Sequence, residues 1–122
     1  MARVVIPVQE LDNRNEFAAG GLNTAMFTAI DATSGAEFDM SARDDKLLVI
    51  VQNGATSAKN VTVHHGDGIQ GVCDLTASVA ASSYTFVNLD SGRFKVMSGD
   101  DKGKVLITGD SADIKVAVFK LP

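Results

Sequence analysis

The stretch "KLLVIVQNG", residues 46–54, decides the fold class. Five consecutive apolar residues, 47–51, lead into Asn53-Gly54, a dipeptide that favours a tight turn. A short apolar run that is bounded by turn residues and rich in β-branched side chains is typical of a strand. We therefore expect residues 46–52 to form a central strand that is covered on both faces.

The same texture continues through the second half of the chain. Strands are predicted at "NVTVHHG" (60–66), "SYTFVNL" (83–89), "RFKVM" (93–97), "KVLITG" (104–109) and "DIKVAVFKL" (113–121). In "RFKVM", Phe94 and Val96 would share one face. The best helix candidate, "LTASVAASS" (75–83), is interrupted by Ser, Thr and Val and has no charged partners. Strands every 8 to 12 residues indicate a sandwich or barrel rather than βαβ units.

The first 45 residues add three further strands. "RVVIPV" (3–8) suits a sheet edge because Pro7 cannot donate a ladder hydrogen bond. "LDNRNEFAAGG" (11–21) reads as a surface loop or arm, and "NTAMFTAI" (23–30) and "AEFDMS" (36–41) read as strands. We expect one all-β domain over residues 1–122: an antiparallel β-sandwich, jelly-roll or Ig-like, of about eight strands. Residues 1–22 would form a less regular N-terminal strand and arm.

The segment "GDGIQG", residues 66–71, has the G-x-G-x-x-G spacing of a dinucleotide-binding turn, and Asp90 follows near the place of a ribose-binding acid. That fingerprint works when the turn opens a helix whose N-terminus meets the pyrophosphate. Here the following segment is a poor helix, and the chain is too short for a doubly wound domain. We expect no nucleotide, and we interpret the glycines as a loop that needs positive φ.

Composition excludes several function classes. The net charge is −4 and no cluster of Lys and Arg is visible, which disfavours nucleic-acid binding. No apolar run approaches the 18 residues of a membrane span, and the N-terminus lacks the pattern of a signal peptide. We therefore expect no membrane partner and synthesis in a cytoplasm.

The chain offers little material for catalysis. The single cysteine, Cys73, is expected to be a small buried side chain, and His64 and His65 should point to opposite faces of a strand. Acidic loop residues such as Asp67 and Asp100 leave bound calcium open, although no EF-hand pattern is present. No catalytic triad, metalloprotease helix or phosphate loop is found. We predict a protein that is not an enzyme and has no cofactor.

Several segments resemble one family. "DDKLLVIVQNGATSAKNVTVHHGDGIQGVCDL", "NLDSGRFKV", "KGKVLITG" and "VAVFKLP" are similar to small all-β virion proteins of tailed bacteriophages, and most of all to capsid decoration (auxiliary head or cement) proteins. The likeness covers residues 44–122. It rests on the alternation of strands and turns and on pieces such as "GDGIQG", "SGRF" and F-x-LP.

The resemblance implies a structural role on a virion. Many copies would bind the major capsid protein on the outside of a shell, at local threefold or sixfold positions, after assembly in the bacterial cytoplasm; both a monomer and a homotrimer fit. From the polar arm we expect Arg14, Phe17 and Leu22 to contact the shell, the alternative being a loop packed on its own domain. A second hypothesis is a carbohydrate- or receptor-binding module of a head or tail fibre. The absence of Trp and the single Tyr weaken it.

Overall fold

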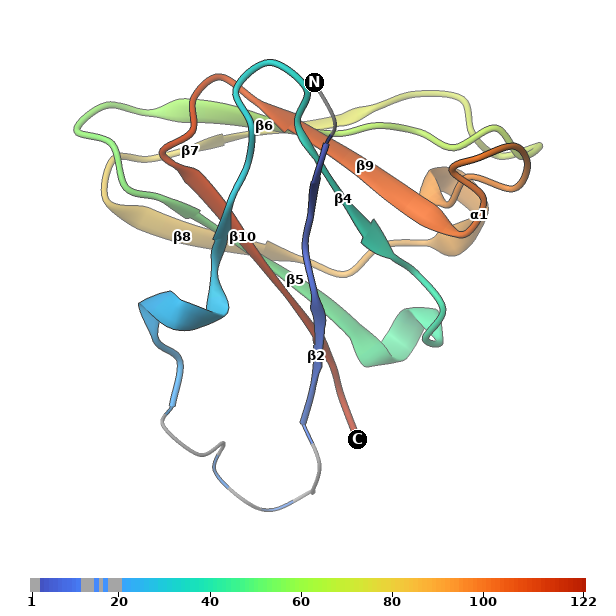
Figure 1. Cartoon of the computed structure of the whole chain (residues 1–122), viewed down its shortest axis with the longest axis horizontal. Helices are drawn as coiled ribbons and strands as arrows, with labels where there is room; N and C mark the ends of the chain where they lie inside the picture. The colour runs from blue at the N-terminus through green and yellow to red at the C-terminus, as the bar shows by residue number, and fades with distance from the viewer. Residues whose placement is uncertain (1–2, 12–14, 16, 18–20) are drawn as a thin grey trace.

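The computed structural model describes residues 3–11, 15, 17 and 21–122. In this part of the chain ten strands form two mixed sheets (Figure 1), which confirms the all-β sandwich. The strands are β1 (Val4–Val5), β2 (Val8–Glu10), β3 (Thr28–Ala29), β4 (Ala36–Asp39), β5 (Leu47–Asn53), β6 (Lys59–Val63), β7 (Leu75–Val79), β8 (Ser83–Val87), β9 (Lys104–Gly109) and β10 (Ile114–Lys120). The helices are two 3-10 turns, η1 (Thr24–Met26) and η2 (Asp44–Lys46), and one α-turn, α1 (Ser91–Phe94).

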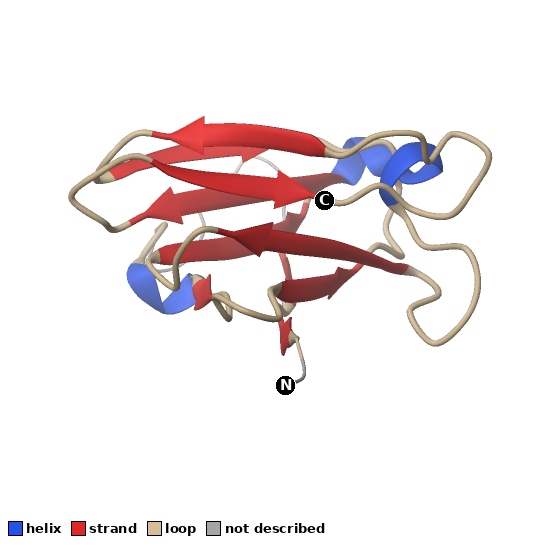
Figure 2. Ribbon diagram, turned by 90° about the horizontal axis from the view of Figure 1, so that it is seen from above, coloured by secondary structure: helices blue, strands red, loops and turns tan. Residues whose placement is uncertain are grey.

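The two sheets differ in their strand order. The first sheet runs β1-β4-β9-β6-β7; the second runs β2-β10-β5-β8, with β3 also paired to β10. Figure 2 shows the strands running across the molecule, with loops and the short helices at its two ends.

The expected central strand is β5. It pairs antiparallel with β10 along its whole length and with β8 on its other side. Its inward side chains, Leu47, Val49 and Val51, are buried, whereas the outward Leu48 and Ile50 are only half-buried. The prediction of a strand covered on both faces is therefore wrong for the outward face. The inward side chains of this continuous apolar run contribute to the core, and its outward side chains form part of a partly exposed surface.

The core lies between the sheets. Inward side chains of both sheets pack there in alternation with outward ones, as the pleat requires. Fully buried side chains come from both sheets and from the loops between them: Ile6, Phe38, Met40, Leu47, Ile107, Ile114, Val116 and Val118. Burying each of them stabilises the fold by about 1.5–3 kcal/mol relative to exposure.

The N-terminal strand joins the two sheets, and here the sandwich departs from the expected antiparallel pattern. β1 pairs parallel with β4 of the first sheet, and β2 pairs parallel with β10 of the second. Figure 1 shows this blue segment crossing in front of the sandwich from one sheet to the other. Pro7 lies between the two pairings, and the buried Ile6 donates its N–H to the Glu37 carbonyl at 2.8 Å. The predicted edge strand is thus an edge of both sheets.

Two predicted strands take other forms. "RFKVM" is not a strand: α1 begins after Asp90, whose carboxylate accepts the Gly92 N–H at 2.9 Å, and it buries Phe94. The chain then bends to lie against β9. "NTAMFTAI" forms η1, capped by the Asn23 side chain, and only the two-residue β3. In both places a local side-chain cap overrides the alternating pattern.

Candidate functional site

The second sheet carries an apolar surface on the side that faces away from the core. Opposite Ile50 of β5 lie Ala117 of β10 and Phe86 of β8, and opposite Leu48 lies Phe119. Because side chains alternate across a strand, all of these point outward. Segments before β3 and after β10 extend the surface. We call the following set the outer face: Leu11, Leu22, Met26, Leu48, Ile50, Tyr84, Phe86, Phe119 and Leu121.

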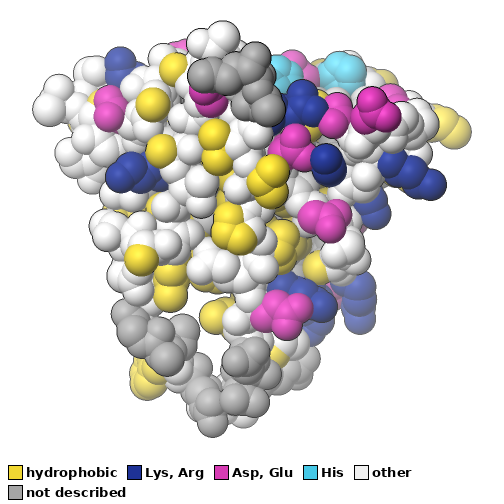
Figure 3. Space-filling model, in the orientation of Figure 1, with side chains coloured by type: hydrophobic (Ala, Val, Ile, Leu, Met, Phe, Trp, Pro, Cys, Tyr) yellow, Lys and Arg dark blue, Asp and Glu magenta, His cyan; other side chains and the backbone are white. Residues whose placement is uncertain are grey.

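Part of the outer face forms a groove. Its volume is about 200 Å³, and its lining is apolar throughout: Leu11, Gly21, Leu22, Met26, Leu48, Ile50, Phe119 and Leu121. Beside it, Phe27, Ala117 and Phe119 form a second small buried cluster. In Figure 3 hydrophobic side chains run down the middle of the molecule, along the front segment that carries β1 and β2, and many of the charged ones lie at its right side.

Hydrogen bonds fix the segment that walls the groove. The Leu11 N–H donates to the Lys120 carbonyl at 3.0 Å, which extends the β2–β10 pairing. The Gln9 amide donates to the Met26 carbonyl at 2.9 Å and holds η1 against β2. Two sides of the groove are therefore formed by segments that hydrogen bonds hold to β10 and to β2.

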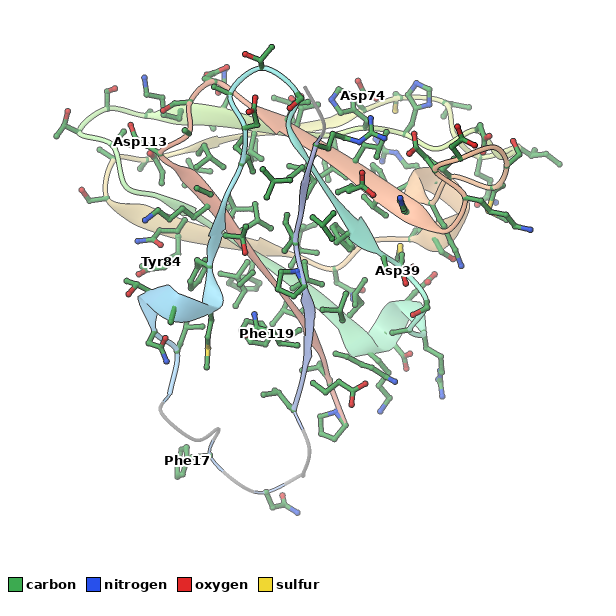
Figure 4. The ribbon with its side chains drawn as sticks, viewed as in Figure 1. Phe17, Asp39, Asp74, Tyr84, Asp113 and Phe119 are labelled. Carbon is green, nitrogen blue, oxygen red and sulfur yellow. The ribbon has the colours of Figure 1, made fainter. Side chains whose placement is uncertain are left out.

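The aromatic end of the outer face lies on β8. Phe86 is 74% exposed and Tyr84 55% exposed, large fractions for aromatic side chains on a sheet. The Tyr84 ring packs against the Phe27 ring at a centroid distance of 5.7 Å and an angle of 58°, a tilted geometry that aromatic pairs favour. Figure 4 labels Tyr84 and Phe119, which lie at separate places along the second sheet. An antiparallel sheet that faced only water would present polar side chains here.

The three residues predicted to contact a shell have different positions. Leu22 lines the groove and is 59% exposed, so it belongs to the outer face. Phe17 is fully exposed and projects away from both sheets (Figure 4). Arg14 lies outside the described residues. Of the two readings of the arm, packing on its own domain applies to Leu11, which lies in the apolar cluster with Phe119.

Sequence reasoning missed most of the outer face. In "SYTFV" the aromatic residues alternate with Ser83, Thr85 and Val87, and nothing in the pattern says which set faces the core. For Leu48 and Ile50 the sequence did carry a signal, because a strand that is apolar at every position is expected to have both of its faces covered by other elements. In the structure other segments cover only part of the outward face of the second sheet.

The glycines of residues 66–71 have a packing role. None of Gly66, Gly68 and Gly71 has positive φ, so the expected positive-φ loop is wrong. A Cβ on Gly66 would collide with the Lys95 carbonyl, and a Cβ on Gly71 would collide with the Gly66 carbonyl. These glycines allow two backbone segments to lie in contact.

Asp67, in the same loop, holds the next loop in place. Its carboxylate accepts the Met97 N–H and the Ser98 hydroxyl, both at 2.6 Å. These bonds, led by the Ser98 hydroxyl, lower the pKa of Asp67. Asp67 therefore joins its own loop to the loop at Met97 and Ser98.

His64 and His65 lie after the end of β6 and converge on one carboxylate. The His64 Nδ1 is 3.2 Å from Asp74 and the His65 Nε2 is 3.8 Å from it, and the His65 backbone N–H also donates to the same carboxylate at 2.9 Å. The prediction that they point to opposite faces is therefore wrong, because the strand has already ended. The hydrogen bond from the His65 backbone N–H, aided by the neighbouring His64 ring, lowers the pKa of Asp74. Figure 3 shows the histidines beside acidic side chains at the top of the molecule.

Cys73 is also placed differently from the expectation. It is exposed rather than buried, and its Sγ lies 3.1 Å from the Arg93 guanidinium. The same guanidinium donates to the carbonyls of Cys73 and Asp74 and so ties this loop to α1. Over residues 3–11, 15, 17 and 21–122, no group of three or more His, Cys, Asp or Glu is arranged to hold a metal ion.

A charged cluster lies on the outward side of the first sheet. Glu37 of β4 is nearly buried and contacts Arg3 at 3.2 Å and Lys104 at 2.7 Å, while Arg3 also contacts Asp101 at 2.6 Å. The hydrogen bond to Glu37 raises the pKa of Lys104. Every charge in this cluster has a partner, and Arg3 ties the start of β1 to β4 and to the loop before β9.

Comparison with known proteins finds no relative of this chain and no similar structure. A scan against models of protein families, a search of curated proteins and a search of solved structures each give no match. None of the helices in the described part of the chain has the length and apolar character needed to span a bilayer. The fold and its outer face therefore define the chain as an all-β sandwich with an exposed apolar surface on one sheet.

Proposed function

We propose that the chain is a non-enzymatic structural protein that binds the outside of a tailed-phage capsid and stabilises it, with the outer face as its contact surface. The observation that carries the proposal is the outer face itself. Contiguous apolar surface that includes exposed aromatics marks protein–protein contacts. The resemblance of residues 44–122 to decoration proteins supplies the identity of the partner, a major capsid protein.

The chemistry of the groove suits a protein partner. Its lining carries no charged side chain, so an apolar side chain or a short apolar segment of the shell can enter without desolvating an ion. Each large side chain that becomes buried on binding contributes about 1.5–3 kcal/mol. Contacts with two or three shell subunits would add avidity to such modest interfaces.

Removing the N-terminus is a poor test of this surface, because residues 1–21 include β1, β2 and the buried Ile6. Point variants are cleaner. Leu22→Ser and Leu48→Ser change the groove, Phe17→Ser changes a fully exposed side chain outside the groove lining, and Ile69→Ser is the control. Ile69 is fully exposed and lies in the glycine loop, which follows β6 of the first sheet.

The experiment is co-sedimentation with shells of tailed phages prepared without their decoration protein. We expect saturable binding at a copy number set by the symmetry of the shell. Leu22→Ser and Leu48→Ser should weaken it by about tenfold each, and Ile69→Ser should leave it unchanged. Binding to intact host cells with none to shells would overturn the proposal and favour the receptor-binding hypothesis.

A further inference from the structure

The four sheet edges are protected to different degrees. Unpaired edge strands invite pairing with another chain, and proteins commonly block them with charges, proline or very short strands. β1 has only two residues and follows Arg3, and β2 follows Pro7 and ends at Glu10. β7 exposes only small side chains at residues 76–78. β8 has neither charge nor proline, and it exposes two aromatic side chains.

The backbone of β8 has free hydrogen-bonding groups at its outer edge. The Lys46 carbonyl accepts a hydrogen bond from the Leu121 N–H. In β5 the backbone N–H and C=O groups of even-numbered residues therefore point toward β10, and those of odd-numbered residues point toward β8. The β8 residues opposite those odd positions are Ser83, Thr85 and Val87. Residues alternate in an antiparallel ladder, so the N–H and C=O groups of Tyr84 and Phe86 point away from the sheet. In the described part of the chain they have no partner.

We propose that this edge pairs with β8 of a second copy to form a twofold-symmetric dimer. Antiparallel pairing centred on Thr85 places Tyr84 opposite Phe86 of the partner subunit, and Phe86 opposite Tyr84 of the partner subunit. Both are hydrogen-bonding positions, so the register pairs all four of these outward-pointing backbone N–H groups. It also forms two cross-strand aromatic pairs on the outer face, each of a kind that stabilises sheets.

The second copy is the occupant that this edge fits best, because a twofold contact requires a patch that complements itself. The strand reads as tyrosine, threonine, phenylalanine around its centre, so each aromatic residue meets the other across the axis. The chain carries a net charge of −4, which opposes self-association elsewhere, but residues 83–87 carry no charge. Tyr84 is already held against Phe27. Dimerisation would also continue the outer face from one copy to the next.

The test measures the association of the purified chain alone, so it is independent of any capsid. Sedimentation equilibrium at micromolar to millimolar concentration compares the wild type with Tyr84→Lys/Phe86→Lys, Tyr84→Lys/Phe86→Glu and the control Ile69→Lys. Both changed positions are exposed, and circular dichroism and urea unfolding confirm that each variant is folded. In the proposed register the first variant places lysine opposite lysine, and the second places lysine opposite glutamate.

We expect the wild type and Ile69→Lys to form a concentration-dependent dimer. The double-lysine variant should raise its dissociation constant by about tenfold or more, and the lysine–glutamate variant should recover most of that loss. A wild type that stays monomeric throughout, or a dimer that the double-lysine variant does not weaken, would overturn the proposal. If the lysine–glutamate variant weakened the dimer as much as the double-lysine variant, the proposal would also be overturned. That result is expected of a different register, in which position 84 or position 86 lies opposite its own copy in the partner.

Discussion

Asn53 offers the sharpest test of what holds the sandwich together. Its side chain is fully buried at the end of β5. The amide donates to the carbonyls of Ser57 at 3.0 Å and Val79 at 2.9 Å, with a longer contact to Ala80, and the side-chain oxygen accepts the Ala55 N–H at 2.9 Å. One side chain thus organises the turn after β5 and ties the second sheet to the end of β7.

Asn53→Ala removes all of these bonds. The contact to Val79 is buried and its carbonyl loses a partner outright, at about 1–3 kcal/mol, while the other groups are part-buried and partly recover by meeting water. We expect the free energy of unfolding to fall by about 3 kcal/mol in urea denaturation. Asn60→Ala, on an exposed position of β6, should change it by less than about 0.5 kcal/mol.

Asn53→Asp keeps the shape of the side chain but removes both of its N–H donors. At neutral pH its carboxylate would face carbonyl oxygens in a buried site, so the loss should exceed that of Asn53→Ala. Burial raises the pKa of the introduced carboxyl, and the penalty should therefore shrink as the pH falls through that raised pKa. A loss below about 1 kcal/mol for Asn53→Ala, or an aspartate variant more stable than the alanine variant at pH 7, would show that these hydrogen bonds do not hold the turn after β5.

Three further predictions follow from single contacts. Gly66→Ala should lower the free energy of unfolding by about 1–3 kcal/mol through its backbone collision, whereas Gly54→Ala, with ordinary space and no positive φ, should be neutral or slightly stabilising in the same urea titration. The pKa of Asp31 is lowered by the N–H groups of the turn that follows it, and that of Asp67 by Ser98 and then Met97, so both favour the folded state while ionised. That contribution is complete above the unfolded carboxyl pKa, near 4, and is lost as the pH falls through the lower folded pKa values. The urea midpoint should therefore fall less steeply between about pH 4 and about pH 2 in Asp67→Asn than in the wild type. An equally steep fall in both proteins would contradict this role of Asp67. Cys73 should react with a thiol reagent in the native protein at nearly the rate of the unfolded chain, whereas protection by folding would contradict its exposed position.

Much of the fold could be predicted from segments whose residue types favour a strand. The apolar run at 47–51 and the alternation Ile114, Val116, Val118 gave the two central strands of the second sheet, since β-branched side chains in these patterns fit a half-buried pleat. The parallel pairings of β1 and β2 could not be predicted, because they depend on which distant strands the N-terminal segment meets.

The misassigned segments share a physical cause. In "SGRFKV" a capping carboxylate begins a helical turn, and the gain from that bond exceeds the preference of Phe94 and Val96 for a strand. The glycine loop and the Cys73 loop depend on contacts with α1, which no local pattern encodes. The outer face was invisible for a related reason: "SYTFV" is equally consistent with either set of side chains facing inward.

The two proposed contacts use different parts of the second sheet. The groove lined by Leu22 and Leu48 is proposed to receive the shell, while the β8 edge is proposed to join two copies. Serine variants of the groove lie off the β8 edge, and lysine variants of Tyr84 and Phe86 lie outside the groove lining. Loss of shell binding with the dimer intact, or the converse, would separate them.

The most direct test of the account is a reconstruction of a capsid carrying this protein. With the chain fitted into the density, the outer face of the β2-β10-β5-β8 sheet should lie against the shell, with Leu22 and Leu48 within contact distance of capsid side chains. A chain bound with that face open to solvent, and attached instead through the glycine loop at residues 66–71 or the first sheet, would contradict it.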